Sequence, residues 1–190
     1  MATSYCEAVL KADINPVHKI YHDLEYGFPI DDDNGLFARL ILEINQAGLS
    51  WETILKKKEN FFTAFDNFNI GKVARYNAKA VARLMSDAGI IRNRLKIEAA
   101  IHNAQRIREL QREHGSFRSW LDQQHPKTKE EWVSIFRENF RFTGGEIVNE
   151  FLMSSGYLPG AHVESCPVYA KVLKKKPKWA QVSKSKKRSV

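Results

Sequence analysis

One helical stripe of apolar residues, with a carboxylate beside it, constrains this chain more than any other part of the sequence. Leucine, isoleucine and phenylalanine recur at positions 36, 37, 40, 41 and 44. This spacing predicts a helix with one face toward the core. Glu43 lies beside that face, where an ionised side chain is costly unless a partner binds it. It is either a ligand-binding carboxylate or a partly exposed residue at the helix edge.

The residues after Glu43 favour a pocket at the end of this helix. Gln46 and Ala47 precede Gly48, which predicts the helix end, and Trp51 follows at once. A carboxylate, an amide and an indole in one place suit a flat ligand that forms hydrogen bonds.

Helical patterns cover most of the remaining chain. Four residues can cap the starts of successive helices: Asn34, Ser50, Asn77 and Asn93. Two Thr-x-x-Glu runs, Thr128 to Glu131 and Thr143 to Glu146, fit capping boxes. No alternating pattern typical of a strand is present. The sequence therefore predicts an all-α fold with an irregular N-terminal stretch.

Length and composition narrow the class of protein. A chain of 190 residues that is 43% hydrophobic can form one globular domain with a substantial core. No apolar run approaches the roughly 20 residues of a membrane helix, so we expect no membrane partner. The N-terminus lacks the pattern of a secretory signal. Two cysteines make no disulfide framework, and we expect a reducing compartment, such as bacterial cytoplasm.

The net charge of +8 is concentrated at the C-terminus. Residues 171–190 hold nine of the 30 basic residues and no acidic one, which leaves 21 basic against 22 acidic residues elsewhere. We therefore expect a single helical domain over residues 1–170 and a basic, flexible tail over 171–190. The tail either adds sequence-independent affinity for phosphate or serves only solubility.

A short connection between two predicted helices, residues 87–96, has a second functional pattern. It contains Gly89 in a tight turn, and Arg92, Arg94 and Lys96 lie at the start of the next helix. Helix N-termini present free N–H groups and a positive dipole end to phosphate. The segment is either a helix-hairpin-helix clamp on a DNA backbone or an ordinary corner with exposed arginines.

Four potential metal ligands lie near the two chain ends. Cys6 and His22 are N-terminal, and His162 and Cys166 follow the last predicted core helix. Two thiolates and two imidazoles complete a tetrahedral Zn²⁺ shell, which leaves no open position and indicates a structural metal. A Cys6–Cys166 disulfide and unrelated polar residues are the alternatives.

Six motifs occur in one order along the chain. They are Tyr21–Gly27, Leu42–Glu43 with Gln46–Trp51, Ile54–Asn60, Asp87–Arg92, Phe140–Gly144, and His162-x-x-x-Cys166. Together they resemble the DNA-3-methyladenine glycosylase I family, from Cys6 to about Cys166. The Gln-Ala-Gly-Leu-Ser-Trp run with its upstream glutamate is a specific motif.

The resemblance implies a helix-hairpin-helix DNA glycosylase fold in which a structural zinc site joins the N- and C-terminal segments. By position, the zinc ligands would be Cys6, His22, His162 and Cys166. The hairpin would hold the DNA backbone through Gly89, Arg92 and Arg94. Glu43 would hydrogen-bond the damaged adenine, with Tyr21 and Trp51 around the base.

The implied enzyme is a monofunctional, monomeric repair glycosylase. It would flip 3-methyladenine out of double-stranded DNA, hydrolyse the N-glycosidic bond and leave an abasic site, with free 3-methyladenine as product. Alkylation makes the base cationic, so an anionic Glu43 favours it, and Tyr21 and Trp51 can stack on it. Glu43 is the candidate catalytic residue, through recognition and electrostatics, and no residue is assigned to activate water.

Three positions depart from the family pattern. His18 stands where the family often has a tyrosine near the base, and it could still stack and form hydrogen bonds. Tyr26 replaces a usual tryptophan, and Ala8 stands where a tryptophan usually follows the first zinc ligand. If the Glu43 pocket were closed, the alternative would be a non-catalytic, zinc-clipped DNA-binding module.

Overall fold

The fold is known from a computed structural model, which describes residues 4–11 and 13–185. These residues form helices and no strand, which confirms the all-α prediction. In chain order the helices are α1 (Tyr5–Ala8), α2 (Pro16–Leu24), α3 (Asp33–Gln46), α4 (Trp51–Lys56), α5 (Lys58–Ala64), the 3-10 turn η1 (Asp66–Phe68), α6 (Ile70–Val73), α7 (Ala78–Ser86), α8 (Arg94–His114), α9 (Phe117–Gln124), α10 (Lys129–Asn139), α11 (Gly145–Ser154), α12 (Pro167–Lys174) and α13 (Lys178–Ser185).

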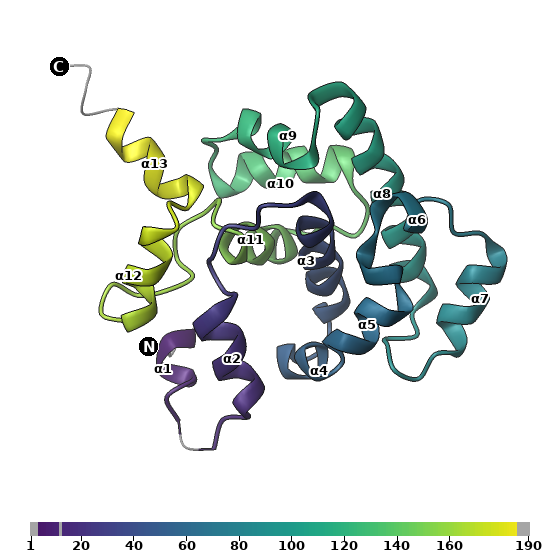
Figure 1. The fold of residues 1–190 in the computed structure, drawn as a ribbon, viewed down its shortest axis with the longest axis horizontal. Helices are drawn as coiled ribbons and strands as arrows, with labels where there is room; N and C mark the ends of the chain where they lie inside the picture. The colour runs from purple at the N-terminus through teal and green to yellow at the C-terminus, as the bar shows by residue number, and fades with distance from the viewer. Residues whose placement is uncertain (1–3, 12, 186–190) are drawn as a thin grey trace.

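Helix α3 is the centre of the molecule, and the other helices surround it (Figure 1). Every residue from Leu36 to Asn45 is buried. The predicted apolar stripe is therefore confirmed, but α3 is covered on all its faces rather than on one. Within the described residues, no helix is long and apolar enough to cross a membrane.

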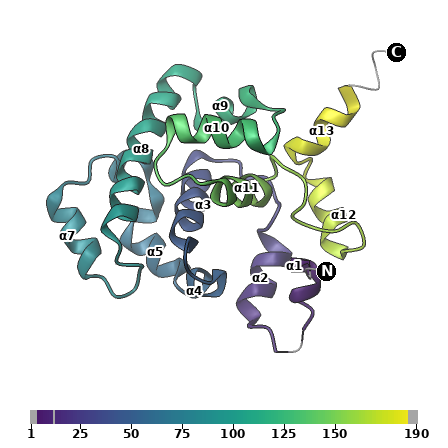
Figure 2. The ribbon, with the colours of Figure 1, turned by 180° about the vertical axis from the view of Figure 1, so that it is seen from behind.

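Helices from distant parts of the sequence meet around α3. Helices α5 to α8 lie on one side of it, and α9 to α11 lie on another (Figures 1 and 2). Helices α1 and α2 lie next to the segment that leads from α11 into α12, so Cys6 and His22 come close to His162 and Cys166. This arrangement places the N-terminal helices over one end of the core.

Most of the predicted helix starts are confirmed. Ser50, Asn77 and Asn93 cap α4, α7 and α8, and Thr128 forms a capping box with Glu131 at the start of α10. In each case the side-chain oxygen accepts a hydrogen bond from a backbone N–H that has no partner within the helix.

Two of the predicted caps are wrong. Asp32, not Asn34, caps α3, and Asn34 instead accepts a hydrogen bond from the backbone N–H of Ile70 at 3.1 Å. The Thr143 hydroxyl donates to the carbonyls of Phe136 and Phe140 at the end of α10, so α11 begins without a side-chain cap. Both side chains connect neighbouring elements instead of starting a helix.

The chain ends contain more helix than we expected. The N-terminal stretch predicted as irregular contains α1 and α2. The segment predicted as a flexible tail contains the end of α12 and all of α13, with Val172 and Pro177 buried. Lys178 lies 3.1 Å from a carboxylate oxygen of Asp122 in α9. Residues 186–190, which include three of the basic residues, lie outside the described residues.

Asp33 joins the central helix to α9. Its carboxylate accepts hydrogen bonds from the backbone N–H groups of Phe117 and Arg118, at 2.9 and 3.0 Å, and from the Gln111 side chain at 2.7 Å. A carboxylate at a helix N-terminus satisfies unpaired donors and interacts favourably with the helix dipole.

Replacing Asp33 by alanine should therefore lower the free energy of unfolding by about 2–3 kcal/mol, because charge-assisted hydrogen bonds are lost. Urea denaturation measures this change. Asp31→Ala is the matched control. Among the described residues, the exposed Asp31 carboxylate pairs only with the partly exposed Arg118 side chain, an arrangement of small net value. An equal loss of unfolding free energy in the two variants would contradict the proposed contribution of the Asp33 hydrogen bonds to stability.

Candidate functional site

A cleft of about 400 Å³ opens beside the C-terminal half of α3. Helices α1 to α4, the segment after α2, and α11 all contribute to its walls. The lining residues are Tyr5, Tyr21, Tyr26, Glu43, Gln46, Trp51, Glu146 and Glu150. The structure thus brings together Tyr21, Glu43, Gln46 and Trp51 in one cavity, as the sequence predicted.

Glu43 is only 4% exposed, so the interpretation as a partly exposed edge residue is wrong. Burial raises the pKa of Glu43 to about 8, and the nearby Glu150 carboxyl acts in the same direction. Arg39, one helical turn earlier, and the Ser154 hydroxyl favour the ionised form and limit the rise. A group that is so costly to ionise gains strongly from a cationic partner.

Aromatic rings form the walls around Glu43. Tyr21 and Trp51 pack edge to face, with ring centroids 5.2 Å apart. The indole N–H of Trp51 is buried, and within the described part of the chain it has no hydrogen-bond partner. An unsatisfied buried donor is unfavourable, and a ligand that offers an acceptor could satisfy it. The cleft therefore offers flat apolar surface with a few polar groups.

The sequence interpretation missed several residues of the cleft. Glu150 is half-buried, accepts a hydrogen bond from the Tyr26 hydroxyl at 3.2 Å, and has a pKa raised by burial. Glu146 lies one turn earlier on α11 and pairs with Lys129 at 3.0 Å. The signal available was two carboxylates at i and i+4 in an otherwise apolar-striped helix.

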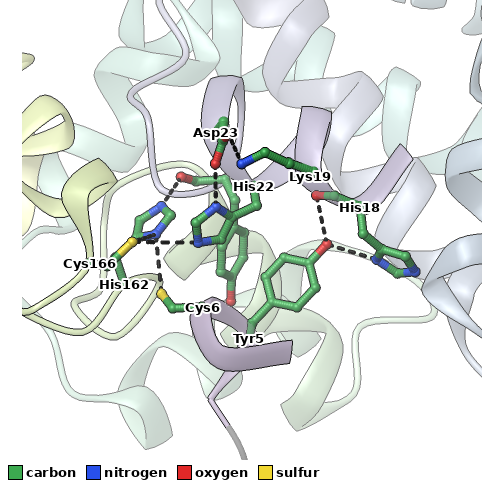
Figure 3. A network of polar contacts seen from close by, with 9 residues as sticks. Tyr5, Cys6, His18, Lys19, His22, Asp23, His162 and Cys166 are labelled. Atoms are coloured by element: carbon green, nitrogen blue, oxygen red, sulfur yellow. Dashed lines mark hydrogen bonds and ion pairs between the residues drawn. The ribbon is translucent and has the colours of Figure 1, made fainter. Parts of the chain in front are cut away.

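Tyr5 also lines the cleft, and no pattern in the sequence indicated this. Its hydroxyl lies 2.9 Å from Nδ1 of His18, as Figure 3 shows. His18 itself, expected near the base, is not among the residues that line the cleft, and its Nε2 lies 3.6 Å from a Glu52 oxygen. His18 therefore contacts the cleft through Tyr5.

The four expected metal ligands come together next to the cleft. The candidate ligand atoms of Cys6, His22, His162 and Cys166 all lie within 4.8 Å of one another (Figure 3). Cys6 Sγ is 3.5 Å from His162 Nδ1, and Cys166 Sγ is 3.7 Å from His22 Nε2 and 3.8 Å from His162 Nδ1. Both cysteines are free thiols, so this structure has no Cys6–Cys166 disulfide.

These distances fit a tetrahedral metal shell. Zinc bonds of about 2.3 Å to sulfur and about 2.0–2.1 Å to nitrogen give tetrahedron edges of about 3.6 Å. The outer ring nitrogens are also held: His22 Nδ1 lies 2.7 Å from an Asp23 oxygen, and His162 Nε2 lies 2.7 Å from the Tyr26 carbonyl. Carboxylate and carbonyl partners of this kind orient histidine ligands. The cluster can therefore hold a metal ion.

The cluster is connected to three tyrosines of the cleft. Tyr5 precedes Cys6, Tyr21 precedes His22, and the Tyr26 carbonyl contacts His162. Each of these aromatic side chains lines the cleft while its neighbour or its own backbone belongs to the cluster. The position of the ligands and the shape of the cleft wall are therefore linked.

The connection from α7 to α8 forms the expected tight corner. The Asp87 carboxylate accepts from the Gly89 N–H at 2.7 Å, and Lys57 donates to the carbonyls of Ala88 and Gly89 at 2.9 and 3.3 Å. A Cβ atom at Gly89 would lie 2.9 Å from an Asp87 oxygen and 3.1 Å from Cβ of Asn60, so only glycine fits easily.

The three basic residues after this corner have different roles. Arg92 and Arg94 are exposed, as a surface for phosphate requires. Lys96 is buried and donates to the carbonyls of Asn45 and Ala47, at 2.9 and 2.7 Å. It therefore satisfies the C-terminal end of α3 and does not belong to the exposed pair.

Comparisons with known proteins agree with this geometry. Residues 11–135 match the family model for methyladenine glycosylase. DNA-3-methyladenine glycosylase 1 of Escherichia coli (strain K12) is 35% identical over 174 residues, which cover 82% of this chain and 92% of the relative. The DNA-3-methyladenine glycosylase of Haemophilus influenzae is 32% identical over 166 residues, covering 77% and 89%.

A solved structure shows the same fold. It is the structure of 3-methyladenine DNA glycosylase I from Staphylococcus aureus, which was solved to explain how that enzyme recognises 3-methyladenine. It superposes on this chain with a TM-score of 0.73 at 34% identity. The match covers 81% of this chain and 92% of that one. The resemblance inferred from the sequence is thereby confirmed, and the chain belongs to the methyladenine glycosylase family.

Proposed function

We propose that this protein excises 3-methyladenine from alkylated DNA by hydrolysis of the N-glycosidic bond. Free 3-methyladenine and an abasic site in double-stranded DNA would be the products. The observation that carries the proposal is Glu43, a carboxyl buried in an aromatic cleft of about 400 Å³. Family membership and the activity named for the E. coli and H. influenzae relatives support the same substrate.

The charge of the substrate explains how Glu43 would act. A base alkylated at N3 is cationic while still attached to the sugar, and a cation beside Glu43 favours its ionised form. The carboxylate also accepts a hydrogen bond from the exocyclic amine, and this charge-assisted bond is strong in a buried site. Unmodified adenine is neutral and gains less from the same residue.

The other residues of the cleft would support the binding of a cationic, flat base. Glu146 and Glu150 add negative charge to the walls, and Tyr21 and Trp51 offer surfaces for stacking. Because the base must leave the duplex to reach them, the enzyme has to extrude the nucleotide. In this proposal Arg92, Arg94 and the backbone around Gly89 contact phosphates and hold the duplex in position.

A structural zinc ion completes the proposal. Its ligands would be the four residues of the cluster, which leave no open coordination position for catalysis. The ion would cross-link the N-terminal and C-terminal segments and would take no part in the reaction. We further propose that the protein acts as a monomer in bacterial cytoplasm. The bacterial sources of its relatives support the bacterial part of this proposal.

Glu43→Gln tests the site directly, because it keeps the shape of the side chain and removes its charge. We expect the variant to fold and to lose affinity for free 3-methyladenine together with excision rate. The loss of a buried charge-assisted hydrogen bond predicts a change of roughly 1.5–3 kcal/mol, about tenfold to a hundredfold. Chromatography of bases released from N-methylated DNA measures the excision rate.

The matched control is Glu113→Gln, the same chemical change at the exposed end of α8. It should leave base release and base binding unchanged. If wild-type protein binds methylated DNA and releases no base, the protein is the non-catalytic DNA-binding module. Full activity in well-folded Glu43→Gln would mean that the active site lies elsewhere.

The raised pKa of Glu43 also predicts a pH-dependent effect on stability. The folded state keeps the proton until about pH 8, whereas the unfolded chain releases it near the ordinary value of 4.5. Wild-type stability relative to Glu43→Gln should therefore fall as pH rises between these values and then stay level. Urea denaturation of both proteins at about pH 5 and about pH 9 measures this difference. A difference that is independent of pH would show that Glu43 ionises without penalty.

The metal proposal predicts one zinc ion per purified chain by elemental analysis. Cys166→Ser should lower both the zinc content and the melting temperature, because one ligand of the cross-link is lost. It should also weaken binding of free 3-methyladenine, since three cleft tyrosines are connected to the cluster. Ser165→Ala, the neighbouring position, should change none of the three. A metal-free wild-type protein of full stability would overturn the zinc proposal.

A further inference from the structure

Arg39 is a buried cation that the proposed mechanism does not use. It lies on α3, one turn before Glu43, and is 6% exposed. It does not line the base cleft. It lines a separate cavity of about 300 Å³, together with Glu25 and Lys58.

The contacts of Arg39 connect this second cavity to the cleft. Its Nη1 donates a hydrogen bond to the hydroxyl oxygen of Tyr21, and its Cζ lies 4.8 Å from the centre of the Tyr21 ring. Its Nη2 donates to a Glu25 oxygen at 3.2 Å, and Lys58 lies 2.5 Å from the other Glu25 oxygen. Glu25 therefore holds the guanidinium in place against Tyr21.

This contact fixes the direction of the Tyr21 hydroxyl. A guanidinium has donors and no acceptor, so the Tyr21 oxygen must accept from it. The hydroxyl hydrogen then has to point elsewhere, and no side chain in the described ranges accepts it. Because Tyr21 lines the cleft, a ligand bound there can accept this hydrogen.

We propose that Arg39 is a positioning residue that makes the Tyr21 hydroxyl a hydrogen-bond donor toward the bound base. In this arrangement Glu43 accepts a hydrogen bond from an exocyclic amine, and the Tyr21 hydroxyl donates one to the neighbouring ring nitrogen. An adenine edge presents that pair, whereas the guanine O6 and N7 edge presents two acceptors. The N7 acceptor is common to adenine and guanine, so the donor that Arg39 fixes strengthens binding of the purine ring, and Glu43 selects the adenine amine. The inference rests on the proposed base-binding role of the cleft.

A double-mutant cycle separates this role from the other effects of Arg39. Arg39 also favours the ionised form of Glu43 and forms part of the packing, and both effects would persist without the Tyr21 hydroxyl. The proteins to compare are Arg39→Met, Tyr21→Phe and the double variant, with binding of free 3-methyladenine measured by calorimetry. Each single variant should bind about threefold to tenfold more weakly, and the loss in the double variant should be smaller than the two single losses combined.

Three further variants keep the test independent of folding defects. Arg39→Lys keeps a donor without an acceptor, so it should restore most of the affinity. Arg39→Gln supplies an acceptor as well as a donor and frees the hydroxyl to turn. It should therefore weaken binding of 3-methyladenine where Arg39→Lys does not, a contrast that a purely structural defect would not give. Lys58→Met removes the other cation on Glu25 and should not alter base affinity. Thermal unfolding of every variant shows which of them retain the fold.

The outcomes distinguish this inference from the proposed function. If Glu43→Gln and Tyr21→Phe both bind the base normally, the cleft is not the base site and the proposed function fails with it. If Tyr21→Phe weakens binding while Arg39→Met and Arg39→Gln do not, the role of Arg39 is overturned. Additive losses in the double variant would overturn it as well, because Arg39 would then act by a route other than the Tyr21 hydroxyl.

Discussion

Burial of α3 on all its faces is the constraint on which the rest of the structure depends. Ten consecutive residues of this helix are buried, and Arg39 and Glu43 are the two charged ones among them. Since they are one turn apart, both charges enter the interior together, and each requires a partner. Arg39 donates hydrogen bonds to the Tyr21 hydroxyl oxygen and to the Glu25 carboxylate. Glu43 faces the cleft, where its carboxyl remains costly to ionise and is available to a ligand.

Two lysines connect the cleft to the corner between α7 and α8. Lys57, just after α4, holds the carbonyls of Ala88 and Gly89 in the corner. Lys96, in the first turn of α8, holds the last carbonyls of α3. One contact joins the junction of α4 and α5 to the corner, and the other joins α8 to the end of α3. The end of α3 and the proposed phosphate-binding corner are therefore fixed relative to each other.

The sequence predicted correctly those features that depend on residues close together in the chain. The apolar spacing around Leu40 and the cap at Asn93 need only neighbouring residues to be recognised. The cleft residues Tyr5 and Glu150 depend on how distant helices meet, which no local pattern contains. The cap of α3 was misplaced because Asp32 and Asn34 are equally good cap residues two positions apart. The many basic residues after position 170 led us to expect a flexible tail, although Val172 and Pro177 in this segment are buried.

The cluster of Cys6, His22, His162 and Cys166 has a consequence for the order in which the protein matures. Cys6 and His22 leave the ribosome early, but His162 and Cys166 follow only after some 140 further residues. During translation the first pair has half a ligand set, and the wall formed by Tyr5, Tyr21 and Tyr26 lacks the contact of Tyr26 with His162. Helices α3 to α11 can pack before the second pair is made, since domains fold as their residues emerge. The wall of the cleft is therefore completed only after the helices of the core have been made.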